Sequence, residues 1–87
     1  MPLIFPNASR SYDSVRGAVR FWGYLSSMEY SFFVTIGALK KVQPNMTPDE
    51  AGFLGAFDAN RDRICAIAAV VYAKGRKGSY ELVRSDF

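Results

Sequence analysis

Residues 17–35, GAVRFWGYLSSMEYSFFVT, decide the predicted fold, because apolar and polar side chains alternate along two runs of this stretch. Alternation with a period of two is typical of a β-strand with one buried face. Between the runs, Leu25-Ser26-Ser27 is short enough to close a hairpin. On one face of this hairpin, four apolar side chains are predicted to point inward: Val19, Phe21, Phe32 and Val34.

The opposite face of the hairpin carries Arg20, Trp22, Tyr24 and Phe33, which form a candidate binding face. Aromatic side chains beside an arginine on an open sheet are what RNA-recognition domains use to stack bases. The same side chains also suit a cover by another segment of the chain, or contact with a protein partner, because exposed aromatic patches usually mark an interface. The sequence leaves these three interpretations open.

Two helical regions are predicted after the hairpin. A short helix over residues 36–42 has Thr35 as its N-cap and Pro44 just beyond its end. A longer region over residues 48–74 keeps a helical period, and one stripe of it is apolar. We expect the stripe to pack on the sheet through Phe53, Ala56, Phe57, Ile64, Ile67, Ala68 and Val71.

The longer region has capping signals at both ends. Thr47 is the predicted N-cap, with Pro48 at the first helical position and Glu50 completing a capping box, and Gly75 is a natural C-terminal cap. A continuous helix of this length is about 40 Å long. A globular chain of 87 residues is only about 30 Å across.

Two arrangements resolve this mismatch of lengths. Either the helix breaks near Asp58-Ala59-Asn60, where Asp58 or Asn60 caps a second helix, or it continues and its overhang packs on another subunit. Asn60 within the apolar stripe favours a break or a polar contact. Because the stripe keeps its phase across the gap, we expect a continuous or gently kinked helix.

The two ends of the chain add shorter elements. Residues 79–84 place Tyr80 and Leu82 on one side and predict a C-terminal strand. Residues 3–5 lie between prolines and are a candidate edge strand, and residues 6–14 are rich in turn-forming side chains.

The predicted fold class is therefore α+β, in one domain over residues 1–87. A small antiparallel sheet contains the hairpin 17–35, the C-terminal strand 79–84 and the candidate strand 3–5. It packs against the helical region 48–74.

A basic loop, Gly75-Arg76-Lys77-Gly78, follows the long helical region. KH domains clamp nucleic-acid backbones with a G-x-x-G loop, but theirs joins two helices. Here the loop leaves a helix and enters a predicted strand, so a helix cap and turn explain it better. Its cations still form a candidate phosphate patch of Lys74, Arg76 and Lys77, which Lys40 and Lys41 would extend.

The composition excludes most catalytic chemistry, because the chain has no histidine and a single cysteine, Cys65. Asp58 and Asp62 are four residues apart and would share a helix face, but Arg61 and Arg63 beside them favour a solvated face with local ion pairs. Cys65 lies among apolar residues and resembles a small buried hydrophobe. We therefore expect no enzyme activity, no metal site and no cofactor.

Charge and targeting signals are weak. The net charge is +3, from 11 basic and 8 acidic residues, which is a smaller excess than phosphate-binding proteins usually carry. A single cysteine cannot form an internal disulfide, and there is no signal peptide or apolar run of membrane-spanning length. These features predict a cytoplasmic protein without a membrane partner.

Six motifs follow one another along nearly the whole chain: Phe5-Pro6-Asn7, Ser11-Tyr12-Asp13, Val19-Arg20-Phe21-Trp22-Gly23, Phe32-Phe33-Val34-Thr35, Phe57-Asp58-Ala59-Asn60-Arg61-Asp62-Arg63-Ile64 and Gly78-Ser79-Tyr80-Glu81-Leu82. Together they resemble a family of small bacterial proteins, domain of unknown function 1488. The resemblance implies a compact α+β domain in the bacterial cytoplasm, with no assigned activity. It carries no catalytic or binding residue over to this chain.

The sequence leads to two functional hypotheses. The first is a small non-enzymatic interaction or regulatory module that forms a homodimer or binds a protein partner, because a thin core, an overlong helix and an aromatic sheet face all favour a second chain. The alternative is weak nucleic-acid binding through the basic loop and the aromatic face. An enzyme ranks third, because only carboxylates, tyrosines, lysines and one cysteine are available for catalysis.

Overall fold

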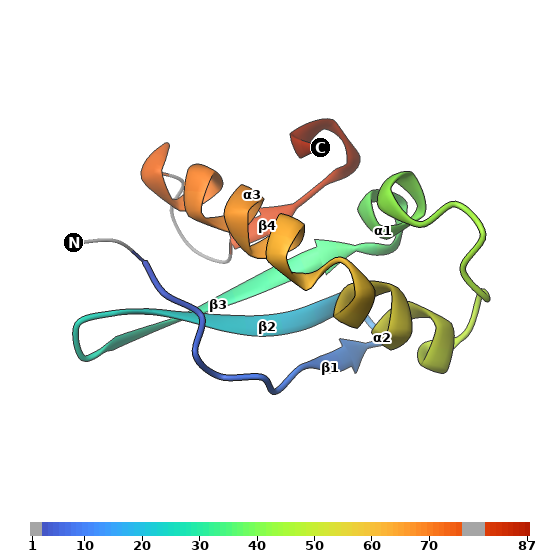
Figure 1. Cartoon of the computed structure of the whole chain (residues 1–87), viewed down its shortest axis with the longest axis horizontal. Coiled ribbons are helices and arrows are strands. Elements are labelled where there is room, and N and C mark those ends of the chain that lie inside the picture. The colour runs from blue at the N-terminus through green and yellow to red at the C-terminus, as the bar shows by residue number, and fades with distance from the viewer. Residues whose placement is uncertain (1–2, 76–79) are drawn as a thin grey trace.

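The computed structural model of this chain describes residues 3–75 and 80–87 and is an α+β fold. A four-stranded sheet lies on one side, and three helices cover one of its faces (Figure 1). The radius of gyration is 12.1 Å and the longest dimension is 36 Å. The elements follow in the order β1 (Ser11–Asp13), β2 (Ala18–Leu25), β3 (Met28–Thr35), α1 (Ile36–Val42), α2 (Glu50–Ala59), α3 (Arg61–Ala73), β4 (Tyr80–Leu82) and a 3₁₀ turn (Arg84–Asp86).

The predicted hairpin is confirmed. β2 and β3 pair antiparallel from Ala18 opposite Thr35 to Leu25 opposite Met28, so Ser26 and Ser27 form the turn. The four side chains predicted to face inward have no exposed surface. They meet the helices in one core cluster, which also contains Leu39, Phe53, Phe57, Ile64, Val71 and Leu82.

The sheet is mixed, which corrects the prediction of an antiparallel sheet throughout. β4 pairs with β3 in parallel, with Phe32 opposite Tyr80 and Val34 opposite Leu82. Between these strands the chain passes through α1, α2 and α3, and this helical crossover returns it so that β4 runs beside the second half of β3. Leu82 is buried and Tyr80 packs against the core, as the predicted strand required.

The N-terminal half differs from the prediction in two places. Residues 11–13 were expected among turns but form β1, which pairs antiparallel with β2 at the edge of the sheet. Three residues are too few to show a period. The candidate strand 3–5 is reduced to one bridge, between Ile4 and Tyr24.

The helical region is broken, so the expectation of a continuous or gently kinked helix is wrong. α2 ends at Ala59 and α3 begins at Arg61. The Asn60 side chain makes no cap for α3; its amide donates to the Ala56 carbonyl at 2.8 Å and to Gln43 Oε1 at 3.1 Å. A polar side chain thus binds a carbonyl at the end of α2 and ends the helix.

Two of the predicted helix caps, Thr35 and Gly75, are confirmed. Thr35 accepts a hydrogen bond from the Ala38 amide at the start of α1, and Gly75 has a left-handed backbone after α3, with φ of 76°. Asn60 occupies the N-cap position of α3, but its side chain makes no capping hydrogen bond there. The capping box at Thr47 is wrong: Asp49 is the N-cap of α2 and accepts from the Gly52 amide at 2.7 Å.

No helix in the described ranges combines the length and apolarity needed to cross a membrane.

Candidate functional site

The residues of the candidate binding face lie close together on the side of the sheet that faces away from the helices. Arg20 and Trp22 on β2 stand beside Phe33 on β3, because Arg20 pairs with Phe33 in the ladder. The Arg20 guanidinium carbon lies 5.2 Å from the Trp22 ring centroid and 5.7 Å from the Phe33 ring centroid. The structure therefore places these residues as predicted, and their binding role stays a prediction.

Much of this face is covered by the chain's own side chains. The Arg16 guanidinium carbon lies 4.1 Å above the Phe33 ring, and Phe33 is only 5% exposed. Arg20 also donates to the Ser31 hydroxyl at 2.9 Å, which holds its guanidinium over the aromatic rings. The arginines therefore occupy the ring faces that a stacked base would need.

Tyr24 lies half-buried at the end of the same face and is engaged from two sides. Its hydroxyl donates to Glu29 Oε2 at 2.6 Å and accepts from the Asn7 amide at 3.2 Å. The hydrogen bond to the Glu29 carboxylate raises the pKa of Tyr24 above its ordinary value. This pair ties the N-terminal segment to the hairpin.

The raised pKa of Tyr24 predicts a measurable change at alkaline pH. Since the folded-state pKa lies above the unfolded value, the Tyr24 hydrogen bond stabilises the fold below pH of about 10 and is lost as pH rises through the folded pKa. Glu29→Gln removes the anionic acceptor, so we expect Tyr24 to ionise at lower pH. Phenolate absorbance gives the readout, with Tyr24→Phe identifying the signal. Equal titration curves for wild type and Glu29→Gln would contradict this assignment.

Most of the candidate phosphate patch lies outside the described residues. Lys74 is exposed at the end of α3, whereas Arg76 and Lys77 lie outside the described residues. Lys40 and Lys41 are exposed in the last turn of α1, which lies toward the opposite end of the molecule from the end of α3 (Figure 1). The suggested extension of the patch by these two lysines is therefore wrong.

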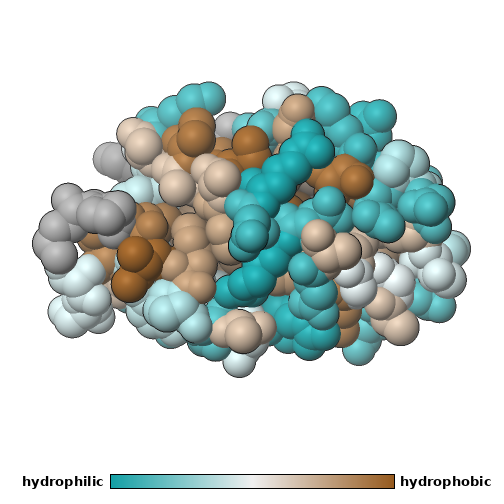
Figure 2. Space-filling model, in the orientation of Figure 1, coloured by the Kyte–Doolittle hydropathy of each residue, from teal (hydrophilic) through white to brown (hydrophobic). Residues whose placement is uncertain are grey.

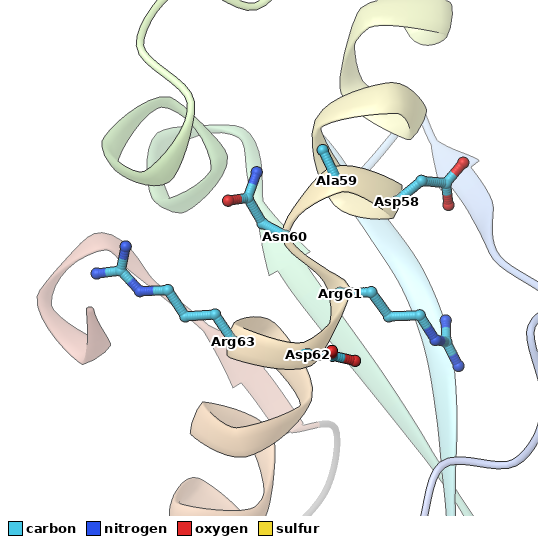
Figure 3. Close-up of a pocket in the computed structure, with 6 residues that line it drawn as sticks. All are labelled: Asp58, Ala59, Asn60, Arg61, Asp62 and Arg63. Carbon is cyan, nitrogen blue, oxygen red and sulfur yellow. The ribbon is translucent and has the colours of Figure 1, made fainter.

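A cavity of about 400 Å³ lies at the junction of α2 and α3, lined by residues 58–63. Figure 3 shows that their side chains diverge: Asn60 and Arg63 point to one side of the helices, and Arg61 and Asp58 point to the other. The break also places Asp58 and Asp62 on different helices. The residues lining this cavity therefore do not converge on a bound group.

The charges near this junction hold the N-terminal segment in place. Arg10 donates from Nε and Nη2 to the two carboxylate oxygens of Asp58, both at 2.9 Å. Arg61 Nη2 donates to the Asn7 carbonyl at 2.7 Å and to the Phe5 carbonyl at 3.4 Å. The ion pairs expected within the helix are thus replaced by contacts with residues about fifty positions earlier, which no local pattern in the sequence indicates.

Cys65 is half-buried on α3, and burial raises the pKa of its thiol. A raised pKa lowers the thiolate fraction at neutral pH, which fits a packing role. Among the described residues, no three carboxylate or thiol side chains lie close enough together to hold a metal ion.

The outer side of α3 is the surface that the sequence analysis missed. Residues 64–73 contain no charged side chain, so the helix is apolar on its solvent side as well as toward the core. Ile64, Ala68 and Val71 are buried, while Val70 is 51% exposed. Figure 2 shows hydrophobic side chains gathered over α3 beside a hydrophilic band. We call Ala66, Ala69, Val70 and Ala73 the apolar face of α3.

A simple signal in the sequence could have found this face. A helix on the surface of a globular protein normally alternates an apolar stripe with a charged one. The ten residues 64–73 break that rule, because no position of the helical wheel carries a charge. The sequence analysis considered only the stripe that packs on the sheet.

Comparison with known proteins gives the family but no activity. Residues 3–83 match the family described as "Protein of unknown function (DUF1488)". No curated protein matches the chain significantly. The fold is similar to the crystal structure of a DUF1488-family protein of unknown function from Shewanella loihica PV-4, with a TM-score of 0.83 and 16% identity over 94% of this chain and 92% of that one. The motifs along the sequence, the α+β fold and this match agree, and the chain belongs to the DUF1488 family.

Proposed function

We propose that this protein is a small non-enzymatic interaction module that works as a homodimer. The observation that carries the proposal is the apolar face of α3, which is exposed although it lacks any charge over ten residues. Helices that are apolar on all sides are normally buried on all sides. Exposed apolar surface on a small domain usually marks an interface. Because the helix is broken at Asn60, its length gives no reason to expect a second chain.

A second copy of the chain would cover this face without burying a charge, because residues 64–73 carry none. Asp62 lies in the first turn of α3, and Lys74 is its C-cap. Both side chains are exposed, and so is that of Arg63 beside Asp62.

The absence of enzyme activity is also part of the proposal. Several polar side chains that catalysis would need are engaged in holding segments together, such as Asp58 with Arg10 and Tyr24 with Glu29. The thiol of Cys65 has a raised pKa. These contacts favour a structural role for the ionisable groups that the structure describes.

Nucleic-acid binding is the competing function, and the outer sheet face makes it the less favoured one. A base stacking on Trp22 or Phe33 would have to displace the guanidinium groups of Arg16 and Arg20. A protein partner at α3 needs no such displacement.

The mass of the purified full-length chain in solution tests the proposal. We expect sedimentation equilibrium to give twice the monomer mass at high micromolar concentration, with dissociation on dilution. Because the interface would be mainly apolar, the dimer should persist in high salt. A strict monomer at these concentrations would contradict the proposal. Salt-sensitive quenching of Trp22 fluorescence by a single-stranded oligonucleotide, without self-association, would support the nucleic-acid function instead.

A further inference from the structure

We infer that the place filled by the Phe5 ring is a binding site for the C-terminus of another polypeptide, an extended segment that ends in an aromatic residue with a free carboxylate. In the structure this site is occupied by residues 3–10, which we call the N-terminal strap and which therefore compete with the ligand. Two observations point to the site: the cradle that holds the Phe5 ring, and a buried donor of Arg61 that has no acceptor. The site is separate from the apolar face of α3.

The cradle for the ring is built around a glycine. The Phe5 ring lies on the helix-covered face of the sheet, with its centroid 6.0 Å from that of Phe21 and 5.5 Å from that of Phe32. A Cβ atom at Gly23 would lie 2.7 Å from the Phe5 ring and 3.0 Å from the Phe32 ring. The lack of a side chain at Gly23 therefore makes room for an aromatic ring directly on the backbone of β2.

The edge of β2 holds the strap as an added strand. Ile4 and Tyr24 exchange two backbone hydrogen bonds, of 2.9 and 2.8 Å, where the strap crosses the hairpin (Figure 1). Leu3 and Phe5 pack against the core, whereas Ile4 between them is 53% exposed. This alternation is that of a β-strand, so the same edge can take up another extended segment by strand addition.

Arg61 carries the donor that lacks a partner. Its Nη2 atom donates to the carbonyls of Phe5 and Asn7, whereas Nη1 is buried and finds no acceptor within residues 3–75 and 80–87. No carboxylate in these ranges forms an ion pair with the Arg61 guanidinium, and the Asp58 carboxylate is bound by Arg10. A buried N–H group without an acceptor is rare in native proteins. The strap thus satisfies this site incompletely.

A terminal carboxylate supplies the acceptor that the strap lacks. The Nη1 and Nη2 atoms of an arginine form a fork that binds a carboxylate through two parallel hydrogen bonds. The Phe5 carbonyl oxygen lies 3.4 Å from Arg61 Nη2. A carboxylate in its place puts one oxygen at Nη2 and lets the other reach Nη1. An amide at the same position has a single acceptor oxygen and leaves Nη1 unpaired.

The strap keeps the site closed through contacts that can be released one at a time. Besides the bridge to Tyr24, it is held by the ion pair of Arg10 with Asp58, whose side chains are 34% and 49% exposed, and by the hydrogen bond from Asn7 to the Tyr24 hydroxyl. Exposed ion pairs add little stability. Because the strap belongs to the same chain, its effective concentration at the site is high. A free peptide therefore binds weakly until the strap is loosened.

Peptide binding to variants with a loosened strap tests the inference. Phe5→Ala empties the cradle, and Arg10→Ala unties the strap without touching the site; circular dichroism checks that both variants fold. The probe is a tripeptide with the sequence of residues 3–5 and a free C-terminal carboxylate, followed by isothermal titration calorimetry. We expect Phe5→Ala to bind it at least about tenfold more tightly than wild type, and Arg10→Ala to show a smaller gain. A purely structural role of Phe5 predicts no gain.

Matched pairs identify the carboxylate and the cradle. In the Phe5→Ala background, the same tripeptide ending in an amide should bind at least about tenfold more weakly than the free acid, and Arg61→Gln should remove this difference. Arg63→Gln is the control that should keep it, since Arg63 is exposed and points to the other side of the helices (Figure 3). Gly23→Ala fills the cradle and should weaken binding of the free acid by at least about tenfold.

Binding of the free acid that depends on the carboxylate, on Arg61 and on Gly23 supports the inferred site. Equal affinities for acid and amide, or a difference between them that survives Arg61→Gln, would show that Arg61 receives no carboxylate and would overturn it. Absence of binding to folded Phe5→Ala and Arg10→Ala would overturn it as well. None of these results depends on whether the chain forms a dimer.

Discussion

Replacing Phe57 with alanine should lower the free energy of unfolding by about 3–5 kcal/mol. Phe57 has no exposed surface, and its ring centroid lies 5.0 Å from that of Phe21 on the sheet. The Arg61 guanidinium carbon lies 5.6 Å from the same ring. Removing the ring therefore opens a cavity between α2 and β2, within the core cluster that joins the helices to the sheet.

Urea denaturation followed by circular dichroism gives this measurement. The loss is large for a domain of this size, whose total stability is about 4–13 kcal/mol, so Phe57→Leu provides an intermediate case. Met28→Ala is the matched control, since Met28 is 58% exposed, and it should change stability by less than about 0.5 kcal/mol. Superimposable curves for Phe57→Ala and wild type would show that α2 does not pack on the sheet in this way.

The second large effect is expected at Gly52, in the first turns of α2. A Cβ atom at this position would collide with the Thr47 carbonyl, which is backbone and cannot rotate away. The Gly52 amide also donates to the Asp49 side chain, so a shift of the helix would weaken its N-cap. We expect Gly52→Ala to destabilise the protein by about 1–3 kcal/mol.

Gly55, one turn later in the same helix, is the matched control with the opposite sign. A Cβ atom at Gly55 meets nothing within 4 Å, so Gly55→Ala gains helix propensity at no steric cost. It should stabilise the protein by about 0.5–1 kcal/mol. Thermal melts of the two variants should therefore move in opposite directions from wild type. Two shifts of the same sign would contradict the close packing of Thr47 on Gly52.

The sheet shows which structural features a local sequence pattern predicts and which it does not. The period of two in β2 and β3 correctly predicts the buried faces and the turn at Ser26, because side-chain direction in a strand depends only on position. It does not predict that β4 runs parallel to β3, since strand direction depends on the path of the chain through three helices. The edge strand β1 is too short to have a period.

For the candidate surfaces too, the sequence predicts some features and not others. Alternation correctly places Arg20, Trp22 and Phe33 on one side of the hairpin, yet it does not show that Arg16 would cover the Phe33 ring. The apolar face of α3 was visible as an uncharged run in the sequence. Its exposure became evident only when the opposite side of the helix was seen to fill the core.

The sequence alone determined the faces of the strands and helices, the caps at Thr35 and Gly75 and the absence of histidine chemistry, because these depend on residue type and on spacing within a few positions. Only the tertiary structure decided the direction of β4, the break at Asn60 and the pairing of Arg10 with Asp58. Each of these three features depends on which distant segment of the chain packs beside it. Burial and hydrogen bonding between distant segments decide which segments pack together. A local hydrophobic period does not predict this.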